Sequence, residues 1–186
     1  STADGYPLDI KTIMDPWLNQ MGFPLVTMTR NGDGTATLTQ NYFLHPPNQD
    51  INLASQWNYK WTIPITVVTT ASSEADWSAR PSAWFDIAET EKTLTGLPVS
   101  LSEWVLINAR QLMYYRVNYD DSNRAAIVSQ LISDHTKILI ESRCSFIDDS
   151  FTIARASYIP ETTAMETTRY LGNERHLNPW YAAIKY

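Results

Sequence analysis

The chain has 186 residues, of which 44% are hydrophobic and 18% charged, so it carries enough apolar side chain for a packed core and is not intrinsically disordered. Its length allows one large domain or two small ones. The formal net charge of −6 and the lack of clustered lysines and arginines argue against binding to nucleic acid or to an anionic membrane surface. The apolar runs are far too short to span a bilayer, and the single cysteine, Cys144, cannot form an internal disulfide. With neither an initiator methionine nor a signal sequence at Ser1, we expect the chain to be part of a longer protein.

The first predicted element is a helix over residues 8–18. Its apolar residues recur at helical spacing and form one stripe: Ile10, Ile13, Met14, Trp17 and Leu18. Pro16 either kinks this helix or begins a new turn that Asp15 caps, and Gly22 ends the segment. A helix with one apolar stripe needs a neighbour, so we expect it to pack on another element.

The next hundred or so residues have the pattern of short strands and turns. About seven strands are predicted, over residues 24–30, 35–44, 57–70, 83–87, 92–94, 104–108 and 114–119. The sequence Asn-Gly-Asp-Gly at 31–34 predicts a hairpin because these residues tolerate positive φ, and the prolines at 46–47 end the second strand. Pro64 has no N–H, so its strand should lie at an edge or carry a bulge. This spacing predicts a two-sheet antiparallel β-sandwich of the immunoglobulin-like type.

After residue 120 the apolar period becomes helical. Three stripes are predicted, formed by Val128, Leu131, Ile132, His135 and Leu139, by Cys144, Ile147, Phe151 and Ala154, and by Ala164, Met165, Thr168 and Leu171. Gly172 ends the third helix, and Asn178 followed by Pro179 predicts a fourth that begins at Trp180. Four helices with short links predict the first helices of an αα superhelix, which needs further neighbours to cover its apolar faces.

The histidines lack the pattern of a zinc site. Helical zinc sites pair two histidines at i and i+4 with a carboxylate nearby, and His45, His135 and His176 are far apart in sequence. His45 follows a strand, His135 lies on a helical stripe and His176 lies in a predicted loop. We therefore predict a structural or surface role for each.

Two pairs of acidic residues could suggest acid–base or metal chemistry. Asp148 and Asp149 are adjacent on a predicted helix, where neighbours point about 100° apart and would not readily converge on one ion. A helix-terminus or interdomain salt bridge is the preferred interpretation. Glu89 and Glu91 are expected on one face of a strand, which is more typical of a solvated surface than of a catalytic pair.

No nucleophile or nucleotide motif is present. Cys144 lies on an apolar stripe, which favours a buried core position, and no G-x-S-x-G, P-loop or dinucleotide-binding fingerprint occurs. The seven tryptophans either form sandwich core, which we prefer, or line a ligand groove. Arg116 could donate forked hydrogen bonds that lock the sandwich to the helices.

Residues 114–120, Tyr-Tyr-Arg-Val-Asn-Tyr-Asp, resemble a signature of the aminopeptidase N-type zinc metallopeptidases (the gluzincin aminopeptidase family). Within that family, the sequence pattern is most similar to that of the insect gut membrane members. Further segments resemble that family in the same order, at residues 13–24, 38–40, 147–151 and 178–183. Met113 departs from the pattern, because the family usually has glycine there.

The resemblance implies three parts: a tail helix of the catalytic domain (1–23), the β-sandwich domain (24–120) and the start of the C-terminal helical domain (121–186). The family's zinc and substrate motifs, His-Glu-x-x-His and Gly-x-Met-Glu-Asn, are absent. The resemblance therefore assigns no catalytic, cofactor-binding or metal residue here, and it implies zinc for the parent only.

The function implied is that of a non-catalytic structural segment of a zinc aminopeptidase that removes N-terminal amino acids from peptides. Its partners would be the rest of the parent chain and, through the parent, peptide substrates. The implied location is the extracellular face of the plasma membrane or the secreted space. The alternative is a receptor-like sandwich surface that binds a protein such as a pore-forming toxin. A third possibility is an unrelated adhesion-type sandwich with a helical tail.

Overall fold

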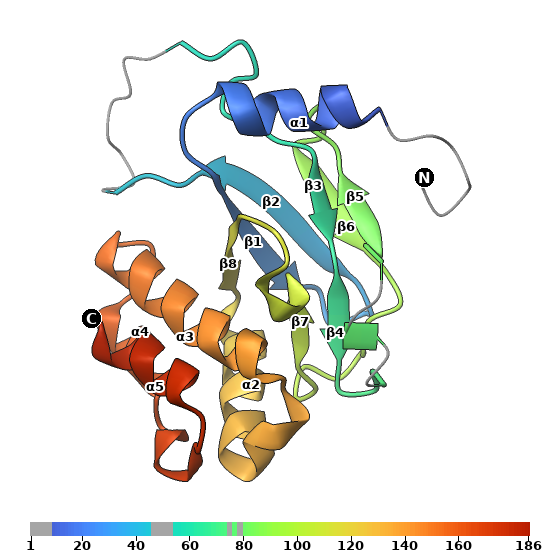
Figure 1. Ribbon diagram of the computed structural model, residues 1–186. Helices are drawn as coiled ribbons and strands as arrows, with labels where there is room; N and C mark the ends of the chain where they lie inside the picture. The colour runs from blue at the N-terminus through green and yellow to red at the C-terminus, as the bar shows by residue number, and fades with distance from the viewer. Residues whose placement is uncertain (1–8, 46–53, 74–75, 78–79) are drawn as a thin grey trace.

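The computed structural model describes residues 9–45, 54–73, 76–77 and 80–186, and in them strands come first and helices follow (Figure 1). The strands are β1 (Pro24–Arg30), β2 (Ala36–Tyr42), β3 (Ile63–Ile65), β4 (Val67–Thr69), β5 (Ala83–Phe85), β6 (Glu91–Leu94), β7 (Val105–Ile107) and β8 (Arg116–Tyr119). The α-helices are α1 (Ile10–Asn19), α2 (Asp121–Asp134), α3 (Ile140–Arg155), α4 (Glu161–Glu166) and α5 (Leu177–Ile184). The predicted order is confirmed: one helix, α1, opens the chain, strands follow it, and the other helices come last.

The hairpin between β1 and β2 forms where the sequence predicts it. Gly32 and Gly34 have φ of 78° and 84°, values that favour glycine. The N–H of Asn31 donates to the carbonyl of Thr35 at 3.0 Å, which closes the turn. The side chain of Asp33 also accepts from the N–H of Thr35 at 2.9 Å. The predicted strand end at 46–48 lies outside the described residues.

The described strands form three sheets. One has four strands in the order β6-β2-β1-β8, and the other two are the pairs β3-β5 and β4-β7. The expectation of antiparallel pairing alone is wrong at one place, because β8 runs parallel to β1, with Leu25 opposite Arg116 and Met28 opposite Tyr119. The residue pattern that predicts a strand carries no information on the direction of that strand. This partner of β1 is also the last strand in the sequence, so the pairing joins segments that are far apart along the chain.

The predicted strand over 57–70 is shorter and is broken. Asn58 and Tyr59 have φ of 51° and 53°, which no strand accommodates, and β3 begins only at Ile63. Pro64 lies in β3, which pairs with β5 alone, so the predicted edge position is confirmed. Thr66 separates β3 from β4, and its hydroxyl accepts from the N–H of Ala109 at 2.8 Å.

One apolar core runs from the sheets into the helices. Its largest fully buried side chains come from both parts: Trp61, Phe85, Leu25, Met28, Leu38, Ile63, Ile65, Ile127, Leu131, Ile138, Ile147 and Ile153. Trp77 and Trp104 are also buried, with ring centroids 6.3 Å apart, so the core interpretation of the tryptophans is confirmed for these residues. Trp180 of α5, by contrast, is exposed.

Helix α1 passes through Pro16 without ending. Asp9 caps it by accepting from the N–H of Thr12 at 3.1 Å, so the alternative of a new turn capped by Asp15 is wrong. The helix finds its neighbour through Trp17, whose ring packs 5.9 Å from that of Trp61 and whose indole N–H donates to a backbone carbonyl at 3.2 Å.

Three predicted helix bounds need correction. Helix α2 ends at Asp134 and a 3₁₀ helix, His135–Lys137, follows it, so Leu139 instead precedes α3. The third helix ends at Glu166 rather than at Gly172, because bonds of the i→i−3 type replace the helical ones from Thr167 on.

Helix α5 begins at Leu177, with His176 as its N-terminal cap residue, and not at Trp180. Of the described helices, none combines the length and apolarity that a bilayer-spanning helix requires.

Candidate functional site

Helix α3 lies along the outer edge of the four-stranded sheet, beside β8 (Figure 1). Asp149 of α3 accepts a hydrogen bond from the backbone N–H of Val117 at 3.0 Å, and its side chain is buried. A carboxylate thus occupies a position where another strand would otherwise pair. This capping protects the β8 edge and fixes the helix against it.

Arg116 joins the same two elements through its side chain. One guanidinium nitrogen, Nη1, donates to the carboxylates of both Asp148 and Asp149, the latter at 2.8 Å. We name Arg116, Asp148 and Asp149 the Arg116 junction. The predicted lock between strands and helices and the predicted salt-bridge role of the aspartates are both confirmed. The two adjacent carboxylates both reach one guanidinium because Arg116 extends toward them from β8.

The end of α5 is tied to this junction. Lys185 forms an ion pair with Asp148, and the hydroxyl of Tyr186 donates to the same carboxylate at 3.2 Å. Two cations therefore face two carboxylates, and the cluster is neutral when all four groups are ionised. Three elements, β8, α3 and the end of α5, meet at this point.

The two carboxylates respond differently to burial. Burial raises the pKa of Asp149 to about 6, against the opposing influence of Arg116 and the Val117 N–H. Burial also acts to raise the pKa of Asp148, but Lys185 and Arg116 outweigh it and hold that pKa below its ordinary value. Both carboxylates are therefore ionised at neutral pH.

Asp120 organises the passage from β8 to α2. Its carboxylate caps α2 by accepting from the N–H of Asn123 at 2.9 Å, and it accepts from the N–H of Arg30 in β1 at 2.9 Å. The Asn123 side chain in turn accepts from the N–H of Val105 at 2.9 Å and donates to its carbonyl at 2.8 Å. Asn123 thus occupies the open edge of β7 as a strand residue would.

A second buried ion pair lies among the helices. Arg143 of α3 donates from Nε to Glu174 at 2.7 Å and from Nη1 to the carbonyl of His135 at 3.0 Å. The other oxygen of Glu174 accepts from the N–H groups of Arg175 and His176 at 2.9 and 3.0 Å. Burial acts to raise the pKa of Glu174, but these partners hold it below the usual value. Neither Arg143 nor Glu174 is predicted from the sequence, because the two residues are 31 positions apart.

The loop before β8 has an unusual backbone. Asn108, Arg110 and Gln111 have φ between 54° and 59°, whereas Met113 does not have positive φ. The Asn108 side chain stabilises the loop by accepting from the N–H of Met113 and donating to its carbonyl, both at 3.0 Å. The conformation that favours glycine therefore occurs earlier in this loop than Met113.

The structure does not bring the other candidate residues together. His45 is exposed after β2, and Nε2 of His135 lies 4.0 Å from Glu174. Glu89 and Glu91 do not share a strand face, because Glu89 lies in a turn where it accepts from a backbone N–H at 2.8 Å. That prediction was wrong because the strand begins only at Glu91.

Cys144 is half-buried against the core rather than enclosed by it, and burial raises the pKa of its thiol. Within the described ranges, no three side chains of the histidine, cysteine, aspartate or glutamate type are grouped to hold a metal ion. The described residues therefore offer no site that fits zinc.

Comparison with known proteins gives a consistent match. Residues 104–186 match the ERAP1-like C-terminal domain. Human aminopeptidase N is 37% identical over 179 residues, chicken aminopeptidase Ey 35% over 178, and rat thyrotropin-releasing hormone-degrading ectoenzyme 33% over 186. These alignments cover 96%, 96% and 98% of this chain, respectively, and the chain spans 17% of the length of each relative. These matches support a segment of an aminopeptidase N-type protein that enters the ERAP1-like C-terminal domain.

Proposed function

We propose that this chain is a non-catalytic structural segment of a zinc aminopeptidase that removes N-terminal amino acids from peptides. The observation that carries the proposal is the Arg116 junction, which fastens α3 to the edge of β8 with two buried or half-buried carboxylates. In the parent, the segment braces the helical part against the sheets. The relatives' names, two of them aminopeptidases, support the activity assigned to the parent.

The proposal divides the chain as the family does. Residues 1–23 are the tail of the catalytic domain, 24–120 an immunoglobulin-like β-sandwich domain, and 121–186 the opening of an αα superhelix. Exposed apolar side chains at both ends support contacts with the rest of the parent: Ile10 and Leu18 of α1 are 61% and 73% exposed, and Leu177 and Ile184 of α5 are 76% and 74% exposed.

The proposal also locates the parent outside the cell or on the extracellular face of the plasma membrane. The name of the rat relative, an ectoenzyme, supports this location. Binding of a pore-forming toxin and the insect gut membrane type stay predictions.

The purified chain is expected neither to hydrolyse an aminoacyl p-nitroanilide nor to retain zinc in stoichiometric amount after dialysis. The reason is that the described residues offer no grouped metal ligands. Hydrolysis that a chelator abolishes would contradict the proposal. A second test reads the coding sequence upstream of Ser1, which is expected to encode the His-Glu-x-x-His motif. An open reading frame without this motif would favour the unrelated adhesion-type sandwich instead.

A further inference from the structure

Strand β4 has an open side. It pairs with β7, with Val67 opposite Ile107 and Thr69 opposite Val105. Both β7 residues turn their backbone groups away from β4. The N–H of Val105 donates to the Asn123 side chain at 2.9 Å, and the carbonyl of Val105 accepts from that side chain at 2.8 Å. The N–H of Ile107 donates to a tyrosine hydroxyl at 3.1 Å. Opposed residues of an antiparallel ladder either exchange both bonds or direct both groups outward. The N–H and carbonyl groups of Val67 and Thr69 therefore point away from β7.

Two neighbouring positions on this open side are already closed. The N–H of Thr69 donates to the Ser72 hydroxyl at 2.9 Å, and its carbonyl accepts from the Ser72 N–H at 3.0 Å. The carbonyl of Ile65 accepts from the N–H of Ser82 at 2.7 Å. Val67 lies between them, and no described residue hydrogen-bonds to its N–H or carbonyl. The N–H and the carbonyl of Val67, spaced as in a strand, therefore remain available to a partner.

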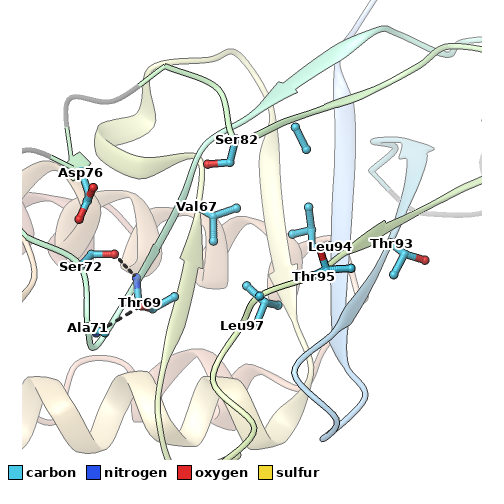
Figure 2. A pocket seen from close by; sticks show the side chains of 12 residues that line it. Val67, Thr69, Ala71, Ser72, Asp76, Ser82, Thr93, Leu94, Thr95 and Leu97 are labelled. Carbon is cyan, nitrogen blue, oxygen red and sulfur yellow. Dashed lines mark hydrogen bonds between the residues drawn. The ribbon is translucent and has the colours of Figure 1, made fainter. Parts of the chain in front are cut away.

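Val67 forms part of the wall of a hollow of about 440 Å³ (Figure 2). This volume lies in the range of about 300–1,000 Å³ that is typical of ligand pockets. Hydroxyl side chains such as Thr93 and apolar ones such as Leu94 line it, and Asp76 is the charged residue among the described lining residues. One oxygen of Asp76 accepts from the N–H of Ser73 at 2.6 Å.

We propose that this hollow binds an extended peptide segment that carries a basic side chain. One residue of the peptide exchanges two backbone hydrogen bonds with Val67, and the basic group faces Asp76. An extended peptide fits because its residues present one donor and one acceptor at the spacing that Val67 offers. A basic group fits because the lining charge is a carboxylate and the chain carries a net charge of −6. A second copy of the chain fits less well, since two-fold pairing at Val67 would bring two Asp76 carboxylates into one interface.

The test uses a fluorescein-labelled peptide, Ser-Thr-Val-Lys-Val-Thr-Ser, titrated with the chain and followed by fluorescence anisotropy. Saturable binding with a dissociation constant below about 1 mM is expected. N-methylation of the peptide bonds that face Val67 should weaken binding at least about tenfold, since it removes a donor and blocks the approach of the strands. Replacing the peptide lysine by glutamate should weaken binding as well.

Asp76→Asn tests the charge without disturbing the core, because Asp76 is exposed. This variant should bind the lysine peptide about twofold to fivefold more weakly and should not lose affinity for the glutamate peptide. Glu161→Gln, an exposed change at the start of α4, is the matched control and should leave binding unaltered. Absence of saturable binding, equal binding of the N-methylated peptide, or concentration-dependent dimerisation that excludes the peptide would each overturn the proposal.

Discussion

Arg116→Met is expected to lower the free energy of unfolding by about 3 kcal/mol, near the lower end of the range for breaking a buried ion pair, because the Arg116 side chain is 21% exposed. The change leaves Asp149 buried without its cation, while Asp148 keeps Lys185. Methionine retains most of the aliphatic length of arginine, so the loss reports the charge and its hydrogen bonds. Urea denaturation at neutral pH measures it through the midpoint at constant slope.

The pH dependence of that loss separates charge from packing. In the folded chain the pKa of Asp149 is raised to about 6, whereas the ordinary aspartate pKa is near 4. Between about pH 4 and pH 6 the folded chain therefore binds more protons at this group than the unfolded chain does. As the pH rises through this range, ionisation of Asp149 lowers the stability of the fold. Without Arg116 the pKa of Asp149 rises further. The cost of Arg116→Met is therefore expected to shrink when the pH is lowered from about 7 to about 5. A cost that stays constant over this range would indicate lost packing instead.

The double change Arg116→Met with Asp149→Leu is the matched control for the first prediction. Removing both partners leaves no unpaired buried charge, because Asp148 keeps Lys185, so part of the stability lost in Arg116→Met should return. The backbone N–H of Val117 loses its acceptor in this variant, which sets a remaining penalty of about 1–3 kcal/mol.

Arg143→Met is expected to destabilise the helical part by about 3–5 kcal/mol, since both Arg143 and Glu174 are almost completely enclosed. The variant leaves the Glu174 carboxylate without its cation and removes one of the two donors to the carbonyl of His135, which keeps the N–H of Ile138. Thermal unfolding followed by far-ultraviolet circular dichroism measures the loss.

Acid should reduce the difference between Arg143→Met and the unaltered chain. In the unaltered chain the pKa of Glu174 is held below its usual value, so its contribution is present above about pH 4 and is lost as pH falls through the lowered pKa. In the variant the unpaired carboxyl takes up a proton at higher pH, which relieves the penalty. Glu161→Gln, on an exposed helix start, should show no such change. An equal destabilisation at pH 7 and pH 4 would contradict the assigned role of Glu174.

The sequence predicts strongly patterned elements well. The glycines at 32 and 34 specify the hairpin because the turn needs positive φ, and buried residues alternate with half-buried ones along most of β2. The locking role predicted for Arg116 rests on its planar fork of donors, and the structure shows that guanidinium donating to two carboxylates. Helix ends were predicted less well, since Pro16 lies inside α1 and the third helix ends well before Gly172.

Pairing and partners could not be predicted, because they depend on contacts between residues far apart in sequence. Nothing local to Asp149 indicates that it will cap a backbone N–H of β8, 32 positions earlier in the chain. The parallel β1-β8 pairing and the Arg143–Glu174 pair have the same origin. A polar residue within an apolar stripe is the signal that could have suggested Asn123, whose buried amide completes the edge of β7.

The most direct measurement of the bracing role is native-state hydrogen exchange at two amides, Val26 in β1 and Ile147 in α3. Both residues are completely buried, and the Arg116 junction lies between their elements. If the junction fastens the helices to the sheet, both amides exchange through one opening reaction whose free energy equals that of global unfolding. Exchange of Ile147 through an opening several kcal/mol below that of Val26 would show that the helices separate from the sheet on their own, and would contradict the bracing role.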